Sequence, residues 1–142
     1  MDVLPLLRKF KDSHESREDW EIGEEGEWIR DREGYHAIFW CRRLRLHTVQ
    51  SMVRGGKVSI RDGEFWIVEN AKLMIFISES IPDELLDELE TSRELQERAV
   101  VYDVARGLKV GRGNEVSTEL ERFLSEEGGI TLKSLRRVRY EL

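Results

Sequence analysis

The sequence predicts an α+β fold in which an antiparallel β-meander over about residues 57–78 is flanked by helices in a single compact domain of residues 1–142. Asp62-Gly63 joins two short runs of alternating or apolar residues, and Asp-Gly favours a type I′ hairpin because that turn needs positive φ at both central residues. Residues 72–78 contain five consecutive apolar residues, which is typical of a strand buried on both faces. We therefore expect this run to be the central strand of the meander.

Composition limits the class of protein. The formal net charge is -6 and 37 % of residues are charged, which excludes a globally basic nucleic-acid-binding protein but allows a local basic face. Such dense surface charge is typical of thermophile proteins. Cys41 is the only cysteine, which excludes an internal disulfide and a CxxC motif. With no apolar run of about 18 residues and no signal-peptide pattern, we expect a soluble, cytoplasmic protein without a membrane partner.

The first half of the chain is expected to contain a helix over residues 2–11, an acidic surface loop over 12–26, strands over 27–30 and 35–40, and a helix over about 46–54. Pro5 is compatible with the first turn of the first helix. The loop is expected because acidic residues far outnumber basic ones there. Aromatic and β-branched residues favour the two strands, and Gly55 is typical of the end of a helix.

The second half is expected to contain a helix from Pro82 with a fresh start at 91–94 and a continuation through 95–102, a strand over 108–111, a helix over 118–128 and a last strand within 130–142. Proline favours the first turn of a helix, and Thr91 and Thr118 each begin a capping-box pattern. Residues 108–142 are also a candidate for a short second subdomain.

One stretch of this acidic chain is basic. Between residues 42 and 61 there are six basic residues and no acidic residue, namely Arg42, Arg43, Arg45, Arg54, Lys57 and Arg61. Such clusters bind phosphate backbones, and arginine also stacks on unpaired bases. The alternative is that these side chains form ion pairs with the acidic helices or the acidic loop.

Catalytic and metal-binding patterns are weak. The three histidines, His14, His36 and His47, have no spacing typical of a metal site, and Cys41 beside Trp40 suits a small core residue better than a nucleophile. We expect no cofactor and no metal.

A helix, three meandering strands and a helix also describe the core of PD-(D/E)xK nucleases. These enzymes need an Asp on the second strand and Glu-x-Lys on the third, so that two carboxylates bind Mg²⁺ and a lysine orients the attacking water. Here Asp62 lies in the expected turn, and Glu69 and Lys72 are three residues apart, which places them on opposite faces of a strand. A degenerate nuclease of this kind stays an alternative.

Two stretches carry a resemblance to a known family. Tyr35 leads to Leu44-Arg-Leu46 and Met52-Val53 in a leucine-rich helix, and Gly56-Lys-Val-Ser-Ile60 follows as a strand. Later, an expected helix with Val100-Val-Tyr102 leads to Arg106-Gly107-Leu-Lys-Val110 and Gly113. Together, over roughly half the chain, these stretches resemble the archaeal tRNA-splicing endonuclease family.

The catalytic residues of that family are a Tyr, a His and a Lys in its second domain. After Gly113 this chain has Tyr140 and Lys133 but no histidine. The resemblance therefore implies a reduced, non-catalytic accessory subunit that binds RNA such as tRNA, or a catalytic partner chain, through the basic segment. The alternative to an RNA-binding role is a protein–protein interaction module. In either role the alternating carboxy-terminal tail favours pairing with a partner chain or a second copy.

Overall fold

The structure is a computed structural model that describes residues 3–55, 57–60, 63–68 and 71–135, of which 55, 57–60 and 63–66 are described by their backbone only. Its helices are α1 (Leu4–Asp12), the short 3₁₀ helix η1 (Glu15–Arg17), α2 (Leu46–Gly55), α3 (Asp83–Thr91), α4 (Arg93–Arg98) and α5 (Glu115–Gly128). Its strands are β1 (Glu21–Ile22), β2 (Trp28–Arg30), β3 (His36–Arg43), β4 (Lys57–Ile60), β5 (Gly63–Trp66), β6 (Leu73–Ser80), β7 (Ala99–Asp103), β8 (Leu108–Val110) and β9 (Lys133–Ser134).

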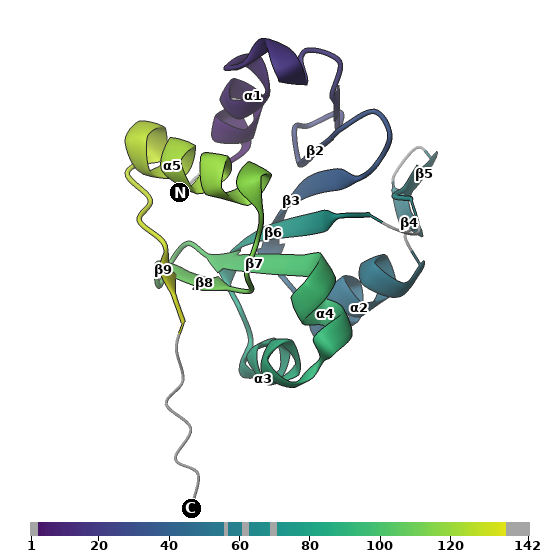
Figure 1. Ribbon diagram of the computed structural model, residues 1–142, viewed down its shortest axis with the longest axis vertical. Coiled ribbons are helices and arrows are strands. Elements are labelled where there is room, and N and C mark those ends of the chain that lie inside the picture. The colour runs from purple at the N-terminus through teal and green to yellow at the C-terminus, as the bar shows by residue number, and fades with distance from the viewer. Residues whose placement is uncertain (1–2, 56, 61–62, 69–70, 136–142) are drawn as a thin grey trace, which may run out of the picture.

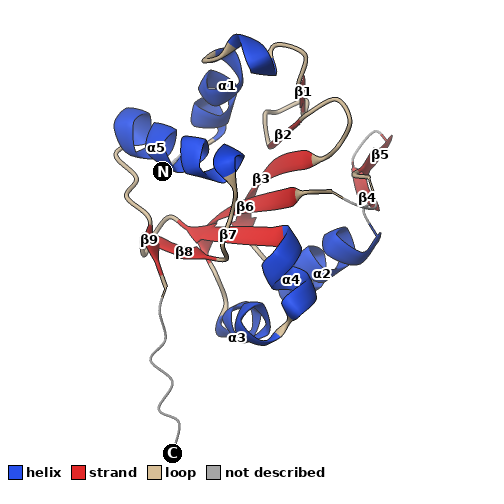
Figure 2. Cartoon of the chain, in the orientation of Figure 1, coloured by secondary structure: helices blue, strands red, loops and turns tan. Residues whose placement is uncertain are grey.

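A mixed sheet with helices on both faces forms the centre of the molecule (Figures 1 and 2). Its strand order is β1-β2-β3-β6-β7-β8-β9. The three central strands β3, β6 and β7 are parallel, whereas β2 runs antiparallel to both of its neighbours and β8 runs antiparallel to β7. The sheet therefore combines a parallel centre with shorter strands on both sides.

Strand β6 is the centre of the core. Each residue from Leu73 to Ile77 is at most 3 % exposed, because one set of side chains packs under α2, α3 and α4 and the alternate set packs under α1 and α5. Parallel neighbours need long crossover connections. Helix α2 lies in the connection from β3 to β6, and α3 and α4 lie in the connection from β6 to β7.

The α+β class and the single compact domain predicted from the sequence are confirmed. The prediction that residues 72–78 form the third strand of the meander is wrong. β4 and β5 form the expected antiparallel hairpin as a separate two-stranded sheet. Gly63, however, pairs with Ile60 as the first residue of β5, so the predicted turn with Asp62-Gly63 at its centre is wrong for Gly63, and Asp62 lies outside the described residues. The expected third strand is β6, which pairs with β3 and β7 instead. A strand that is apolar on both faces needs cover on both faces, and the centre of the main sheet provides it.

The expected helix through 95–102 is also wrong. Helix α4 ends at Arg98, and Ala99–Asp103 forms β7, in which every residue is buried. Val100, Val101 and Tyr102 are β-branched or aromatic, which favours a strand, and a short apolar run does not distinguish a buried strand from a helix by its period.

The remaining segments follow the prediction with three changes. Helix α5 begins at Glu115, earlier than the expected 118, because Asn114 and Ser117 form a reciprocal capping box. Residues 108–135 belong to the main sheet and its helix layer, so this part of the proposed second subdomain is no separate unit. The acidic stretch 12–26 contains η1 and β1, and Arg17 attaches it to the core through bonds to the Phe10 carbonyl and Glu119.

Gly111 provides a test of the tight connection from β8 to α5. Its φ is +110°, and an added Cβ would lie 2.7 Å from the Ala99 carbonyl oxygen, so we expect Gly111→Ala to lower the free energy of unfolding by about 2–4 kcal/mol. The measurement is urea denaturation. The matched control is Gly129→Ala, which also has positive φ but no atom within 4 Å of the added Cβ, and which should cost only about 1 kcal/mol. Equal losses for the two variants would contradict this assignment.

Candidate nucleic-acid interface

Three of the six predicted basic residues lie together at the carboxyl end of β3. Arg42 and Arg43 end β3, Arg45 precedes α2, Arg54 lies in the last turn of α2, Lys57 begins β4, and Arg61 lies outside the described residues. The structure thus brings Arg42, Arg43 and Arg45 to one place and sets Arg54 at the far end of α2.

The backbone between Arg43 and Arg45 is anchored at Leu44. Leu44 is 2 % exposed, and its N–H donates to Oγ of Ser78, which is fully buried in β6. Because Leu44 packs in the core, Arg43 and Arg45 are exposed on either side of it. A fixed backbone reduces the entropy that a bound ligand must remove from these side chains.

Ion pairing accounts for part of the basic segment. Arg54 pairs with Glu94 of α4 at 3.4 Å, and Arg42 pairs with Glu79 at 3.6 Å although the Arg42 side chain is 83 % exposed. Exposed pairs of this kind contribute at most about 1 kcal/mol. Arg43 and Arg45 form no ion pair with any residue that the structure describes. Internal pairing therefore leaves two arginines available.

Both arginines line a cleft of about 590 Å³ at the carboxyl ends of β3 and β6. The lining residues are Arg43, Leu44, Arg45, Leu46, His47, Gln50, Ser80, Pro82 and Glu84. Leu46 and His47 begin α2, so the positive end of the α2 dipole adds to the charge of the arginines. Glu84 is the one acidic residue in this lining. The cleft suits a ligand with negative charge and polar groups.

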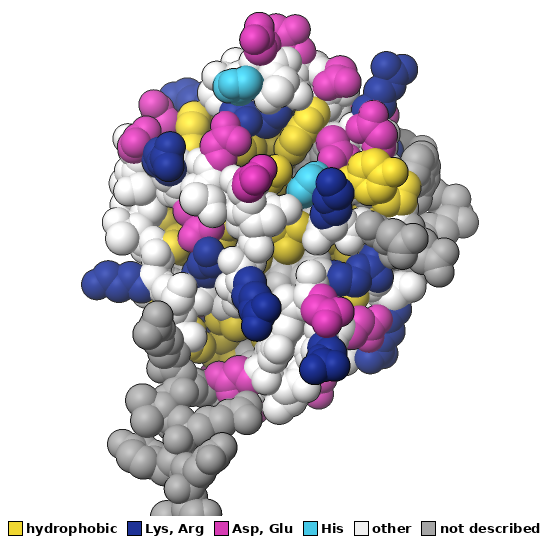
Figure 3. All heavy atoms as spheres, viewed as in Figure 1, with side chains coloured by type: hydrophobic (Ala, Val, Ile, Leu, Met, Phe, Trp, Pro, Cys, Tyr) yellow, Lys and Arg dark blue, Asp and Glu magenta, His cyan; other side chains and the backbone are white. Residues whose placement is uncertain are grey.

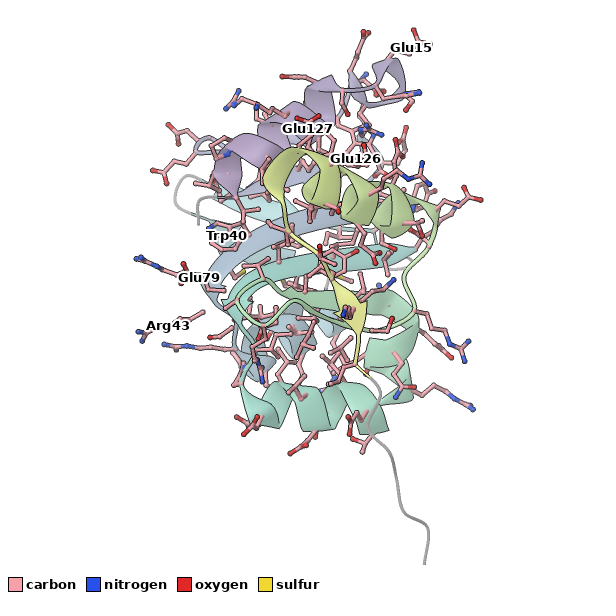
Figure 4. All side chains as sticks on the ribbon, turned by 90° about the vertical axis from the view of Figure 1, so that its left-hand side faces the viewer. Glu15, Trp40, Arg43, Glu79, Glu126 and Glu127 are labelled. Carbon is pink, nitrogen blue, oxygen red and sulfur yellow. The ribbon has the colours of Figure 1, made fainter. Side chains whose placement is uncertain are left out.

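Trp40 extends the surface over the edge of the sheet. It lies two residues before Arg42 on β3, so both side chains project from the same face of the strand. Figure 4 shows Trp40, Glu79 and Arg43 along one edge of the molecule, with Arg43 pointing away from it. The charge pattern alone missed Trp40, His47 and Gln50, although the spacing of Trp40 and Arg42 on a strand was a signal for the first. We call Trp40, Arg42, Arg43, Arg45 and the cleft the arginine edge.

The strands that the structure describes do not carry the residues of the PD-(D/E)xK nuclease pattern. The order of a helix, three meandering strands and a helix occurs as α1, β1–β3 and α2, so the second strand is β2, which Asp31 follows. The third strand is β3, which contains no Glu-x-Lys. Of the residues assigned earlier, Asp62 and Glu69 lie outside the described residues, and Lys72 directly precedes β6. Within the described ranges no group of three His, Cys, Asp or Glu is placed to hold a metal ion.

Cys41 is a poor nucleophile. Burial raises the pKa of its thiol to about 11, so the thiol stays protonated at neutral pH.

Asp31 closes the β2–β3 turn and orients the His36 ring. It accepts hydrogen bonds from the backbone N–H groups of Tyr35 and His36, and the His36 Nδ1 lies 3.0 Å from its Oδ2. Asn114 uses its Oδ1 to cap α5 by accepting from Val116 and Ser117, so its Nδ2 donates to His36 Nε2 at 2.9 Å. Both ring nitrogens are therefore occupied, and this Asp-His pair connects β3 to α5 rather than acting as a general base.

Comparisons of the chain with protein-family models, with curated proteins and with solved structures gave no match. Across the described part of the chain, none of the helices has the length and apolar character that crossing a membrane requires.

The Asp31 contacts predict a pH dependence of stability. Burial acts to raise the pKa of Asp31, but the hydrogen bonds from His36 and Tyr35 outweigh it and leave the pKa below its ordinary value. A lowered folded-state pKa stabilises the protein above the unfolded-state pKa, about 4, and this stability is lost as the pH falls through the folded-state value. We expect Asp31→Asn to lower the free energy of unfolding by about 1–2 kcal/mol at pH 7 and by less at pH 3.

The measurement is denaturant unfolding at both pH values. Asp19→Asn is the control, because Asp19 is exposed and outside this network. A loss for Asp31→Asn that is the same at pH 3 as at pH 7 would contradict the role of the ionised carboxylate.

Proposed function

We propose that this chain is a non-catalytic RNA-binding accessory subunit that binds single-stranded RNA through the arginine edge. The observation that carries the proposal is that Arg43 and Arg45 are exposed, anchored through Leu44 and without an acidic partner in the described structure, at the mouth of a cleft. Guanidinium groups donate two parallel hydrogen bonds to phosphate oxygens, which suits the backbone of a nucleic acid.

The chemistry of the arginine edge favours single-stranded RNA over a duplex. Trp40 and Arg42 share one face of β3, so a base can stack on the indole while the guanidinium contacts the next phosphate. The Arg42–Glu79 pair is long and exposed, so exchanging the carboxylate for a phosphate costs little. His47 and Gln50 add polar groups that can bond to ribose or base edges.

The charge of the rest of the chain supports binding at one edge. Acidic residues outnumber basic ones by 29 to 23 over the whole sequence, so most of the surface repels a polyanion. A protein–protein interaction module would need an apolar patch at its centre. The cleft lining supports such a module less, since it places two unpaired arginines, a histidine and a glutamine beside only a few apolar residues.

The accessory role needs a catalytic partner chain or a second copy. Strand β9 is short, exposed and at the edge of the sheet, where backbone groups can pair with another chain. The resemblance to the tRNA-splicing endonuclease family supports tRNA as the class of RNA. However, the helix that this resemblance expects at 100–102 is strand β7, so the RNA-binding proposal depends on the arginine edge and not on the resemblance.

The test replaces both unpaired arginines. We expect Arg43→Gln/Arg45→Gln to weaken binding of a fluorescently labelled 12-nucleotide single-stranded RNA by about 10- to 100-fold. Losing two phosphate contacts should also reduce the slope of log K against log salt by about 1.4. The measurement is fluorescence polarisation between 50 and 300 mM KCl.

Arg8→Gln/Arg122→Gln is the matched control. It removes the same charge from exposed positions on α1 and α5, and it should change neither the affinity nor the slope by more than a small factor. An unchanged slope in the Arg43/Arg45 variant, or equal losses in both variants, would disprove the proposal.

A further inference from the structure

A second cavity lies at the opposite end of the central strands. It has a volume of about 450 Å³ and is lined by Lys72, Leu73, Arg93, Gln96, Glu97, Arg112 and Gly113. Leu73 begins β6, whereas Ser80 at the end of the same strand lines the arginine edge. The length of β6 therefore separates the two places by roughly 25 Å. We call this cavity the amino-edge pocket.

Three positive side chains from distant parts of the sequence meet around this pocket. Lys72 directly precedes β6, Arg93 begins α4 and Arg112 lies between β8 and α5. None of the three forms an ion pair with a residue in the described part of the chain, and Glu97 is the one acidic side chain in the lining. In Figure 3, Lys and Arg side chains spread over the middle of the molecule, whereas Asp and Glu side chains are dense towards α1.

The backbone on both sides of Arg112 has a conformation that requires glycine. Gly111 and Gly113 have φ of +110° and +71°, a conformation that other residues rarely adopt. A Cβ on Gly113 would collide with Ser117, which completes the capping box of α5. The chain therefore holds Arg112 at the start of α5, where the positive end of the helix dipole adds to its charge.

An aromatic surface lies beside the pocket. Tyr35 is 42 % exposed and is the one large hydrophobic side chain classed as exposed in the described residues. The Lys72 Nζ lies 5.9 Å from the centre of its ring, and the Lys72 N–H donates to the Tyr35 carbonyl at 2.8 Å. Tyr35 thus adjoins the pocket through Lys72, and an exposed ring beside a positively charged pocket is an arrangement that can bind a base together with its phosphate.

We propose that the amino-edge pocket binds a nucleoside monophosphate unit. Lys72, Arg93 and Arg112 contact the phosphate, and the base stacks on Tyr35. Glu97 accepts a hydrogen bond from a ribose hydroxyl, which gives a role to the single carboxylate in a positive pocket. One N–H of the Gln96 amide already donates to the Glu90 carbonyl at 2.7 Å, and its second N–H donates to the phosphate or the ribose. A volume of about 450 Å³ is within the usual range for sites of small ligands.

This site does not depend on the arginine edge. The monophosphate unit can belong to a free nucleotide or to the 5′ end of a strand, because the recognised groups are the same. A loss of function at the arginine edge would leave this pocket intact, and the reverse also holds.

The experiment follows the backbone amide signals of ¹⁵N-labelled protein by NMR during titration with AMP. We expect AMP to shift the amides of Leu73, Gly113 and Asn114, and Arg93→Gln/Arg112→Gln to weaken AMP binding at least about tenfold. Adenosine, which lacks the phosphate, should bind at least about tenfold more weakly than AMP. Tyr35→Leu should weaken AMP binding by about three- to tenfold while leaving the weak binding of inorganic phosphate unchanged.

Lys9→Gln is the charge control, because Lys9 is exposed on α1 and should leave AMP binding unchanged. A 5′-phosphorylated tetranucleotide identifies the source of the unit, since tighter binding than AMP indicates the end of a strand and equal or weaker binding indicates a free nucleotide. The proposal is wrong if AMP leaves these amides unshifted. It is also wrong if the double variant binds AMP as the unmodified chain does, or if inorganic phosphate binds as tightly as AMP and Tyr35→Leu has no effect.

Discussion

The burial of β6 on both faces is the constraint on which the rest of the structure depends. An extended strand of Leu, Met, Ile and Phe loses contact with water only if neighbouring strands cover both of its edges and other elements cover both of its faces; here the neighbours are the parallel strands β3 and β7, and helices cover the faces. Parallel pairing with β3 and β7 in turn requires the crossovers through α2 and through α3 and α4. These three helices lie on one face, so α1 and α5 must cover the other face.

The same constraint places the arginine edge. Parallel strands end together, so the segments after β3, β6 and β7 meet at one edge of the sheet. Buried polar groups fix these segments: Ser78 accepts from Leu44, and Asp103, which is fully buried, accepts from the N–H of Ile81 and from Arg106. Each of these groups has its hydrogen-bond partners, so the edge is rigid without a ligand. The exposed side chains between these anchors are the ones left to bind another molecule.

Local signals in the sequence were sufficient for local structure. The existence of the β4–β5 hairpin, the end of α2 at Gly55 and the start of α3 after Pro82 follow from turn and capping signals, which act over a few residues, although Gly63 lies in β5 and not at the centre of the turn. The partners of β6 and the strand at 99–103 could not be predicted in this way, because pairing between distant strands is decided by which faces need cover. Arg42, Arg43 and Arg45 were found because they are neighbours in the sequence. Lys72, Arg93 and Arg112 are not, so no charge run indicated their pocket.

The separation of the two sites decides how they can act together. The length of β6, roughly 25 Å, lies between them, and no residue that the structure describes lines both cavities, so an RNA strand that contacts both would have to bridge that distance with several nucleotides. We therefore regard the arginine edge and the amino-edge pocket as two independent sites rather than as the ends of one groove. They also differ in extent: the arginine edge runs from Trp40 on β3 to Gln50 on α2. The amino-edge pocket, by contrast, is a single cavity of about 450 Å³ that Lys72, Arg93 and Arg112 line together. The amino-edge pocket is therefore suited to a small ligand and the more extended arginine edge to a longer strand of RNA.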